Sequence, residues 1–198
     1  MKATGPLSRI RVVLARPSHP GNIGAAARAM KTMGIARLSL VRPKRFPDPE
    51  ARAMAKGALD VLQSARVCAD LDEALAGTTF SVAMSARARE LSHAPLGARA
   101  AARELVAAAR SDEVAVVFGN ETVGLTNREI MRCSCLARIP ASEEYASLNL
   151  AQAVQVMAYE ARLAALEPAA PAPPVGAERA SHEETEKLYV ELERSLAA

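Results

Sequence analysis

The sequence is poor in aromatic residues and cysteine. Only 3% of its 198 residues are aromatic and none is tryptophan, while half are hydrophobic, so the core must consist mainly of Ala, Leu, Val, Ile and Met. Three cysteines (Cys68, Cys133 and Cys135) are too few for a disulfide framework. Cys133 and Cys135 have no second pair of ligands, so we expect no metal site.

Several sequence patterns that would define other classes of protein are also missing. No apolar run approaches the roughly 20 residues that span a bilayer, and residues 1–8 do not resemble an export signal, so we expect a cytoplasmic protein without membrane contact. The chain has no Gly-x-Gly-x-x-Gly, P-loop or Gly-x-Ser-x-Gly motif, and its three histidines are scattered. These absences argue against a Rossmann dinucleotide site, an NTPase and a serine hydrolase.

Positive charge is concentrated near the N-terminus. The net charge is +3, yet residues 1–52 hold eleven Lys or Arg against Asp48 and Glu50, which gives +9 there and leaves −6 for the remainder. A basic block of this kind indicates a polyanion partner such as RNA, although the same residues could simply cover solvated turns. Few aromatic residues are available to stack on bases, so contacts to phosphate and ribose are the better expectation.

Short β-branched runs alternate with helical stretches, a pattern that predicts an α/β fold with parallel strands and crossover helices. The expected strands are residues 10–14, 37–41, 66–68, 79–84, 114–118 and 136–139. The expected helices are residues 23–33, 51–55, 71–75, 96–109, 127–132 and 150–166.

The composition changes after residue 166. Residues 1–166 form the main domain, and the Pro/Ala-rich residues 167–180 favour an extended linker. Ser181 and Glu184 then form a capping box before a helix with an apolar stripe at Leu188, Leu192 and Leu196. We expect residues 181–198 to be the first helix of a C-terminal extension that is cut short.

Each of three segments joins the end of a predicted strand to the start of a predicted helix. They are residues 22–28 (NIGAAAR), residues 116–121 (VVFGNE) with 124–127 (GLTN), and residues 139–149 (IPASEEYASLN). Open α/β proteins bind ligands at the carboxyl ends of their strands, so the three segments are expected to form one split site. Simpler interpretations exist for each: Asn22 and Asn149 stand where ordinary N-caps belong, and Arg28 could be a solvated side chain.

In this order, the segments resemble the three motifs of the SPOUT methyltransferases, in particular the SpoU or TrmH-type RNA 2′-O-ribose methyltransferases. The resemblance covers residues 8 to about 165. It implies an open parallel sheet with helices on both faces, a C-terminal deep trefoil knot, S-adenosylmethionine as the cofactor and a homodimer that uses residues 150–166. The implied catalytic residues are Arg28, Asn22, Glu121, Ser147 and Asn149. The implied cofactor-binding residues are Met84, Ser85, Ala86, Gly119, Ile139, Ala146, Ser147 and Leu148.

Within this family, the chain looks most like the TrmJ-type tRNA enzymes. Residues 28–34 (RAMKTMG), residues 144–149 (EYASLN) and the Pro-rich linker carry that similarity. It implies methylation of a pyrimidine ribose in the anticodon loop of tRNA, at position 32. Asn120 stands where nearer tRNA-modifying relatives often have Arg, so another tRNA position, ribosomal RNA or an inactive RNA-binding module remain alternatives.

Overall fold

The computed structural model describes residues 5–87, 94–168 and 179–197. These residues form a parallel sheet in the order β3-β2-β1-β6-β4-β7-β5. The strands are β1 (Ile10–Ala15), β2 (Arg37–Val41), β3 (Arg66–Cys68), β4 (Phe80–Met84), β5 (Leu96–Gly97), β6 (Val114–Phe118) and β7 (Cys135–Arg138).

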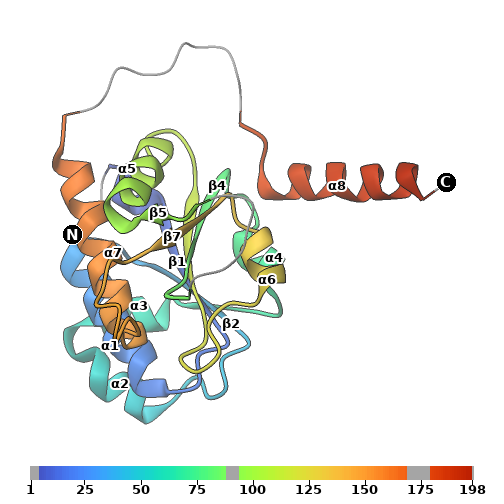
Figure 1. The fold of residues 1–198 in the computed structure, drawn as a ribbon. Coiled ribbons are helices and arrows are strands. Elements are labelled where there is room, and N and C mark those ends of the chain that lie inside the picture. Colours follow the sequence, from blue (N-terminus) through green and yellow to red (C-terminus); the bar gives the residue numbers. More distant parts are fainter. Residues whose placement is uncertain (1–4, 88–93, 169–178, 198) are drawn as a thin grey trace.

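Helices connect the strands (Figure 1). They are α1 (Pro20–Met33), α2 (Pro49–Ala55), α3 (Leu59–Gln63), α4 (Leu71–Leu75), α5 (Ala98–Ala108), α6 (Asn127–Met131), α7 (Leu150–Leu166) and α8 (His182–Leu196), with short 3₁₀ turns at Pro6–Arg9 and Lys56–Ala58. In the described part of the chain, no helix is long and apolar enough to cross a membrane.

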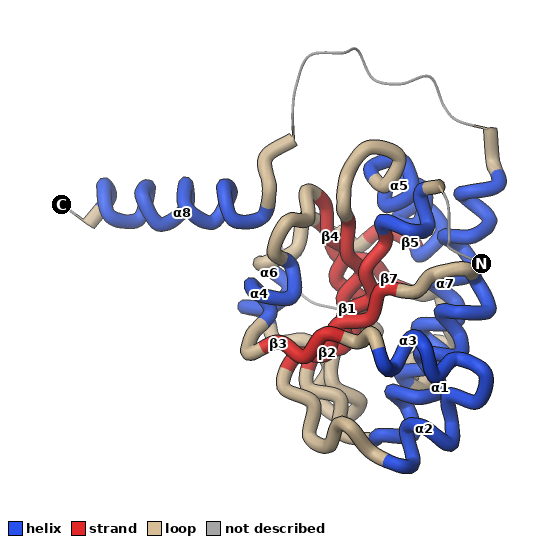
Figure 2. The backbone as a smooth tube through the Cα atoms, turned by 180° about the vertical axis from the view of Figure 1, so that it is seen from behind, coloured by secondary structure: helices blue, strands red, loops and turns tan. Residues whose placement is uncertain are grey.

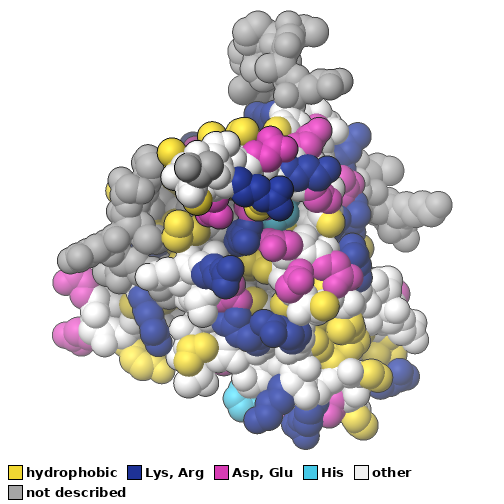
Figure 3. Space-filling model, turned by 90° about the vertical axis from the view of Figure 1, so that its right-hand side faces the viewer, with side chains coloured by type: hydrophobic (Ala, Val, Ile, Leu, Met, Phe, Trp, Pro, Cys, Tyr) yellow, Lys and Arg dark blue, Asp and Glu magenta, His cyan; other side chains and the backbone are white. Residues whose placement is uncertain are grey.

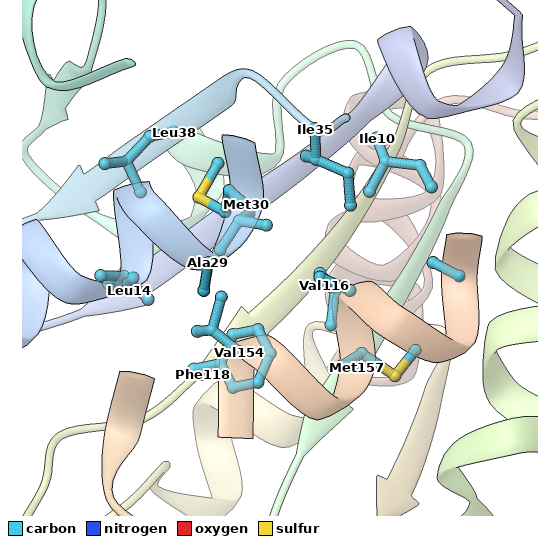
Figure 4. Packing of buried hydrophobic residues seen from close by; sticks show 14 of the residues in the cluster. Ile10, Leu14, Ala29, Met30, Ile35, Leu38, Val116, Phe118, Val154 and Met157 are labelled. Atoms are coloured by element: carbon cyan, nitrogen blue, oxygen red, sulfur yellow. The ribbon is translucent and has the colours of Figure 1, made fainter. Parts of the chain in front are cut away.

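The strands bury both of their faces because side chains alternate along a strand. In β1, Val12 and Leu14 belong to the larger core, which packs against α1, α2, α3, α5 and α7. Val13 and Ala15 belong to the smaller core, which packs against α4 and α6. Figure 4 shows side chains of β1 and β6 meeting Met30 of α1 and residues of α7 in the larger core. Helices on both faces of a parallel sheet are therefore confirmed.

Most predicted elements are confirmed, and three local differences have physical reasons. Helix α1 begins at Pro20, with His19 as its N-cap, so the expectation that Asn22 is the N-cap is wrong. Proline is favoured in the first turn of a helix, where a missing N–H costs nothing. Leu96 and Gly97 pair with β7 instead of beginning α5, a partnership that local sequence does not reveal. Helix α3 was not predicted, because its N-cap position is Ala58 and no side-chain cap marks its start, whereas α4, of the same length, follows the N-cap Asp70.

Helix α8 has the predicted capping box between Ser181 and Glu184. Its first two turns are bound to the domain: the backbone N–H of His182 donates to the Thr78 carbonyl at 2.8 Å, and Arg132 pairs with Glu186. The predicted stripe of three leucines is exposed, and the helix extends away from the body of the molecule (Figure 1). Residues 169–178 of the predicted linker lie outside the described residues, and the trefoil knot stays a prediction.

Helices α1 and α2 approach closely because Gly24 has no side chain. A Cβ atom at Gly24 would lie 2.1 Å from the carbonyl oxygen of Ala51, which belongs to the α2 backbone. Such a contact cannot be relieved by a rotamer change, so the two helices would have to separate. The position of α1 matters for the site described below, since Asn22 and Arg28 are on this helix.

Replacing Gly24 with alanine tests this packing. In an ordinary helix interior, Gly→Ala stabilises by about 1 kcal/mol. Here we expect the free energy of unfolding to fall instead, by about 1–3 kcal/mol, because overpacking forces the backbone to shift. Gly57→Ala is the matched control, since nothing lies within 4 Å of its added Cβ. Urea denaturation measures both, and an unchanged or higher midpoint for Gly24→Ala would contradict the close approach.

Candidate active site

The loops that follow β1, β4, β6 and β7 gather at the carboxyl edge of the sheet, because parallel strands all end on the same side. The loops after β4, β6 and β7, with the start of α7, line a cavity of about 360 Å³, and the lining segments begin at Met84, Phe118 and Ile139. Figure 2 shows tan loop segments collected below the ends of the strands. The second and third predicted segments therefore come together, and the loop after β4 completes the wall.

The cavity wall contains every residue that the family resemblance implied for the cofactor. They are Met84, Ser85, Ala86, Gly119, Ile139, Ala146, Ser147 and Leu148. Arg87, Thr122, Leu150 and Ala153 also line the cavity and were not predicted. Phe118, Asn120 and Gly124 belong to the predicted second segment, and Glu121 was expected as a catalytic residue. Arg87 and Thr122 are neighbours of predicted residues, and Arg87 donates to the Thr122 carbonyl at 3.3 Å.

Glycines allow the second segment to turn tightly under the cavity. A Cβ at Gly119 would lie 2.3 Å from the backbone of Gly124 and Leu125, so the missing side chain makes room for the chain's own backbone. Gly124 has a φ of +69°, a conformation that glycine adopts without strain.

Glu121 is the centre of the polar part of the site. Its carboxylate accepts hydrogen bonds from the backbone N–H of Ser18 at 2.8 Å, from the N–H of His19 at 3.2 Å and from Asn22 Nδ2 at 3.0 Å. Burial acts to raise the pKa of Glu121, but these hydrogen bonds outweigh it and the pKa is lowered. The side chain is thus held as an anion against the N-terminus of α1, where negative charge is stabilised.

Asn22 and Asn149 extend this hydrogen bonding to the third segment. Asn149 Nδ2 donates to Asn22 Oδ1 at 2.9 Å, and Asn149 Oδ1 accepts from the Ala151 N–H at 2.9 Å. Asn149 is therefore the N-cap of α7, as its simpler interpretation held, and it also joins α7 to α1. We call Asn149, Asn22 and Glu121, with the backbone groups they bind, the positioning network.

A second set of contacts braces the loop before α1. Asn120 Nδ2 donates to the Arg16 carbonyl at 2.8 Å and to Ser18 Oγ at 2.6 Å. The Arg16 guanidinium pairs with Glu129 and also donates to the Gly124 carbonyl at 3.2 Å. These contacts were not predicted, because they connect segments about a hundred residues apart.

Arg28 lies apart from the other predicted catalytic residues. It is exposed on α1, about 9 Å along the helix axis from Asn22, and does not line the cavity. Ser147, in contrast, contributes to the cavity wall. Within this chain, the structure therefore brings together Asn22, Glu121, Ser147 and Asn149, while Arg28 faces solvent.

Glu121→Gln tests the network through acid stability. A glutamine offers only one acceptor oxygen to three donors, so the free energy of unfolding at pH 7 should fall by about 1–3 kcal/mol. Because the pKa of Glu121 is lowered by folding, its contribution is complete above the unfolded pKa of about 4.3 and is lost as pH falls through the folded pKa. The variant should therefore lose less stability between pH 6 and pH 3 than the parent protein.

The measurement is a series of urea midpoints across that pH range. Glu143→Gln is the control, since Glu143 is an exposed carboxyl in the same region of the molecule. Equal midpoints for Glu121→Gln and Glu143→Gln at pH 7 would show that the network contributes nothing to stability.

Comparisons with known proteins agree with this geometry. The SpoU rRNA methylase family model matches residues 9–159. The tRNA (cytidine/uridine-2′-O-)-methyltransferase TrmJ of Escherichia coli K12 is 47% identical over 97% of this chain and 79% of its own length. The crystal structure of a methylase family protein from Neisseria gonorrhoeae has a TM-score of 0.84 at 39% identity, covering 95% of this chain and 96% of that one. TrmJ from Z. mobilis has a TM-score of 0.81 at 33% identity, covering 94% and 79%. The chain belongs to the SpoU methylase family.

Proposed function

We propose that this protein transfers a methyl group from S-adenosylmethionine to the 2′-hydroxyl of a pyrimidine ribose in the anticodon loop of tRNA, at position 32. The observation that carries the proposal is the cavity at the carboxyl edge, walled by the second and third segments and joined to the first by the positioning network. The names of relatives that are 47% identical, which specify cytidine and uridine in tRNA, support the substrate.

The cavity fits the cofactor in size and character. Its volume of about 360 Å³ lies within the range of about 300–1,000 Å³ for small-molecule sites, which are mostly apolar with a few polar groups. Met84, Ile139 and Leu148 offer apolar surface for an adenosyl group, while Ser85 and Arg87 offer polar contacts. When bound, S-adenosylmethionine supplies an electrophilic methyl on a sulfonium, a good leaving group.

The protein's own task is then to align the ribose and to stabilise the charge that develops on its oxygen. Glu121 is a poor candidate for the base, because three donors already occupy its carboxylate and its pKa is lowered. Its role is to hold Asn22 and the start of α1 in place. Arg28 stabilises the 2′-oxyanion and grips the adjacent phosphate, since a guanidinium hardly ever gives up its proton. A phosphate of the substrate or a water takes the proton.

The proposal includes a homodimer, which the surface of α7 and the position of Arg28 support. One line of α7 residues is buried in the core, but Val156 and Leu163 are half-buried, and Tyr159 and Leu166 are exposed at 48% and 71%. This second line offers apolar surface to another copy. Because Arg28 does not line the cavity of its own chain, a site completed by two copies accounts for both features.

Nucleoside mass spectrometry tests the function directly. Unmodified bulk tRNA incubated with the protein and S-adenosylmethionine should gain 2′-O-methylcytidine or 2′-O-methyluridine, which fragment analysis places at position 32. A structural relative at 26% identity is described in connection with 2-OH methylation of C/U34 on tRNA, so position 34 is examined on the same fragment. Product at position 34 would show that the proposed position 32 is wrong. Cofactor binding without any product would indicate that the substrate is another RNA. Absence of both product and cofactor binding would refute the proposal that the protein is a methyltransferase.

Arg28→Ala should separate chemistry from cofactor binding. Loss of one group that stabilises an oxyanion lowers kcat by about 10²–10³-fold. Cofactor affinity, measured by calorimetry, should stay at the parent value, because Arg28 is outside the cavity. Arg110→Ala is the control, as Arg110 is exposed beyond the end of α5. A parallel loss of cofactor affinity and kcat would contradict the assigned role.

A further inference from the structure

The structure separates the cations of the N-terminal basic block into two groups. Members of the first group are bound within the protein: Arg9 and Arg11 donate to backbone carbonyls, Arg16 pairs with Glu129, Lys31 with Asp60, Arg37 with Glu113, and Arg45 lies near Asp48 and Glu50. The second group comprises Arg28, Arg42, Lys44 and Arg52, which make no ion pair with any residue that the structure describes. In the described part of the chain, the exposed, unpaired positive charge of the basic block thus belongs to these four side chains.

Three cations of the second group follow the carboxyl end of β2. Arg42 and Lys44 are exposed in the loop between β2 and α2, and Arg52 is exposed on α2. The backbone N–H of Lys44 donates to the Pro17 carbonyl at 3.0 Å, and the next residue, Ser18, donates to Glu121. The loop is therefore attached to the residues before α1, whose backbone binds Glu121 of the candidate site.

The backbone at Arg42 is in a conformation that arginine adopts at a cost. Its φ of +43° lies in the left-handed region, which glycine and asparagine occupy more readily. The N–H of Arg42 still donates to the Cys68 carbonyl, so the strain occurs where the chain leaves the sheet. No ion pair within the described ranges explains a cation at this position, and strained residues of this kind concentrate at functional sites.

The surrounding surface is suited to a phosphate backbone and not to bases. Phe46, the aromatic residue of this loop, packs partly buried against the larger core and offers no open ring for stacking. Figure 3 shows Lys and Arg side chains over this face of the molecule, several of them at its lower edge beside a histidine. The loops at the carboxyl ends of the strands lie at this lower end (Figure 2).

We propose that Arg42, Lys44 and Arg52 form a phosphate-binding strip that holds the RNA backbone beside the active site. This inference rests on the proposed function, because it assigns the surface on which that RNA substrate lies. Lys44 lies after β2 and is hydrogen-bonded to the loop that follows β1, and Arg52 lies on α2, the next helix along the chain. The strip contributes affinity and position, while the choice of nucleotide belongs to the cavity.

The test compares two variants with the same loss of charge. The strip variant is Arg42→Gln, Lys44→Gln and Arg52→Gln. The control variant is Arg37→Gln, Arg66→Gln and Arg110→Gln, whose first two residues begin β2 and β3 at the opposite edge of the sheet. Binding of an unmodified tRNA transcript is followed by fluorescence anisotropy at several salt concentrations, with thermal midpoints to confirm folding.

For the strip variant, we expect at least tenfold weaker binding and a shallower dependence of log affinity on log salt. Each phosphate contact contributes a slope of about −0.7 to −0.9, so three lost contacts reduce the slope by about two to three. In the methylation assay KM for tRNA should rise, while kcat at saturating tRNA and cofactor affinity stay at the parent values. Parent-like binding by the strip variant, or an equal loss in the control variant, would overturn the strip.

Arg42→Gly adds a readout that a merely structural role would not give. Glycine relieves the strained backbone, so the thermal midpoint should stay or rise while tRNA affinity falls. A lower midpoint together with unchanged affinity would assign Arg42 to folding and refute its place in the strip.

The two proposals fail in different ways. If the parent protein methylates tRNA but the strip variant binds it equally well, the strip is wrong and the function stands. If the parent makes no methylated product, and the strip variant but not the control variant binds RNA more weakly, the phosphate-binding strip is supported and the proposed enzyme activity is wrong. Binding of the parent to anionic vesicles but not to RNA would overturn the strip as an RNA surface.

Discussion

The geometry of the active site depends on one chain of hydrogen bonds, which runs from the N-terminus of α7 through Asn149 and Asn22 to Glu121. Its direction is determined at both ends. An ionised carboxylate only accepts and a helix N–H only donates, so each asparagine has a single orientation that satisfies both neighbours. Three segments that are far apart in sequence are thereby held in one arrangement, next to a cavity whose walls belong to two of them.

Much of the sheet could be predicted because strands buried on both faces have a strong local pattern. The strands at 37–41, 66–68 and 114–118 have the predicted bounds, and α4 and α7 do as well. The start of α1 was predicted at the wrong residue, although Pro20 is a residue that the first turn of a helix favours. Here Glu121, from the loop after β6, accepts from the backbone before α1, which leaves Asn22 free to bind elsewhere. The local sequence does not reveal this distant partner, Glu121, which also holds the candidate site together.

The candidate site divides in a similar way. The cavity residues could be identified from motif order, because the loops that follow parallel strands must meet at one edge of the sheet. Contacts between the loops could not be identified, since Asn120 binds Arg16 and Ser18 only after the sheet has formed. Charge was also ambiguous in the sequence. Arg9 and Arg11 belong to the basic block of the sequence. In the structure, their guanidinium groups donate to carbonyls near α5 and α4 and so are bound within the protein.

Arg42 and Lys44 differ from the cations at the amino edge of the sheet, which have partners within the protein. At the amino edge, Arg11, Arg37 and Arg66 lie beside carboxylates or carbonyls, which neutralise that edge. At the carboxyl edge, Arg16 and Arg45 pair with carboxylates, whereas Arg42 and Lys44 make no ion pair with any described residue. The carboxylates of Glu121 and Glu129 already have partners. Glu121 accepts from backbone N–H groups and from Asn22, and Glu129 accepts from Arg16 and Thr126. Asp48 and Glu50 likewise lie beside Arg45, so the carboxylates at this edge have partners and Arg42 and Lys44 remain for the polyanion that we propose.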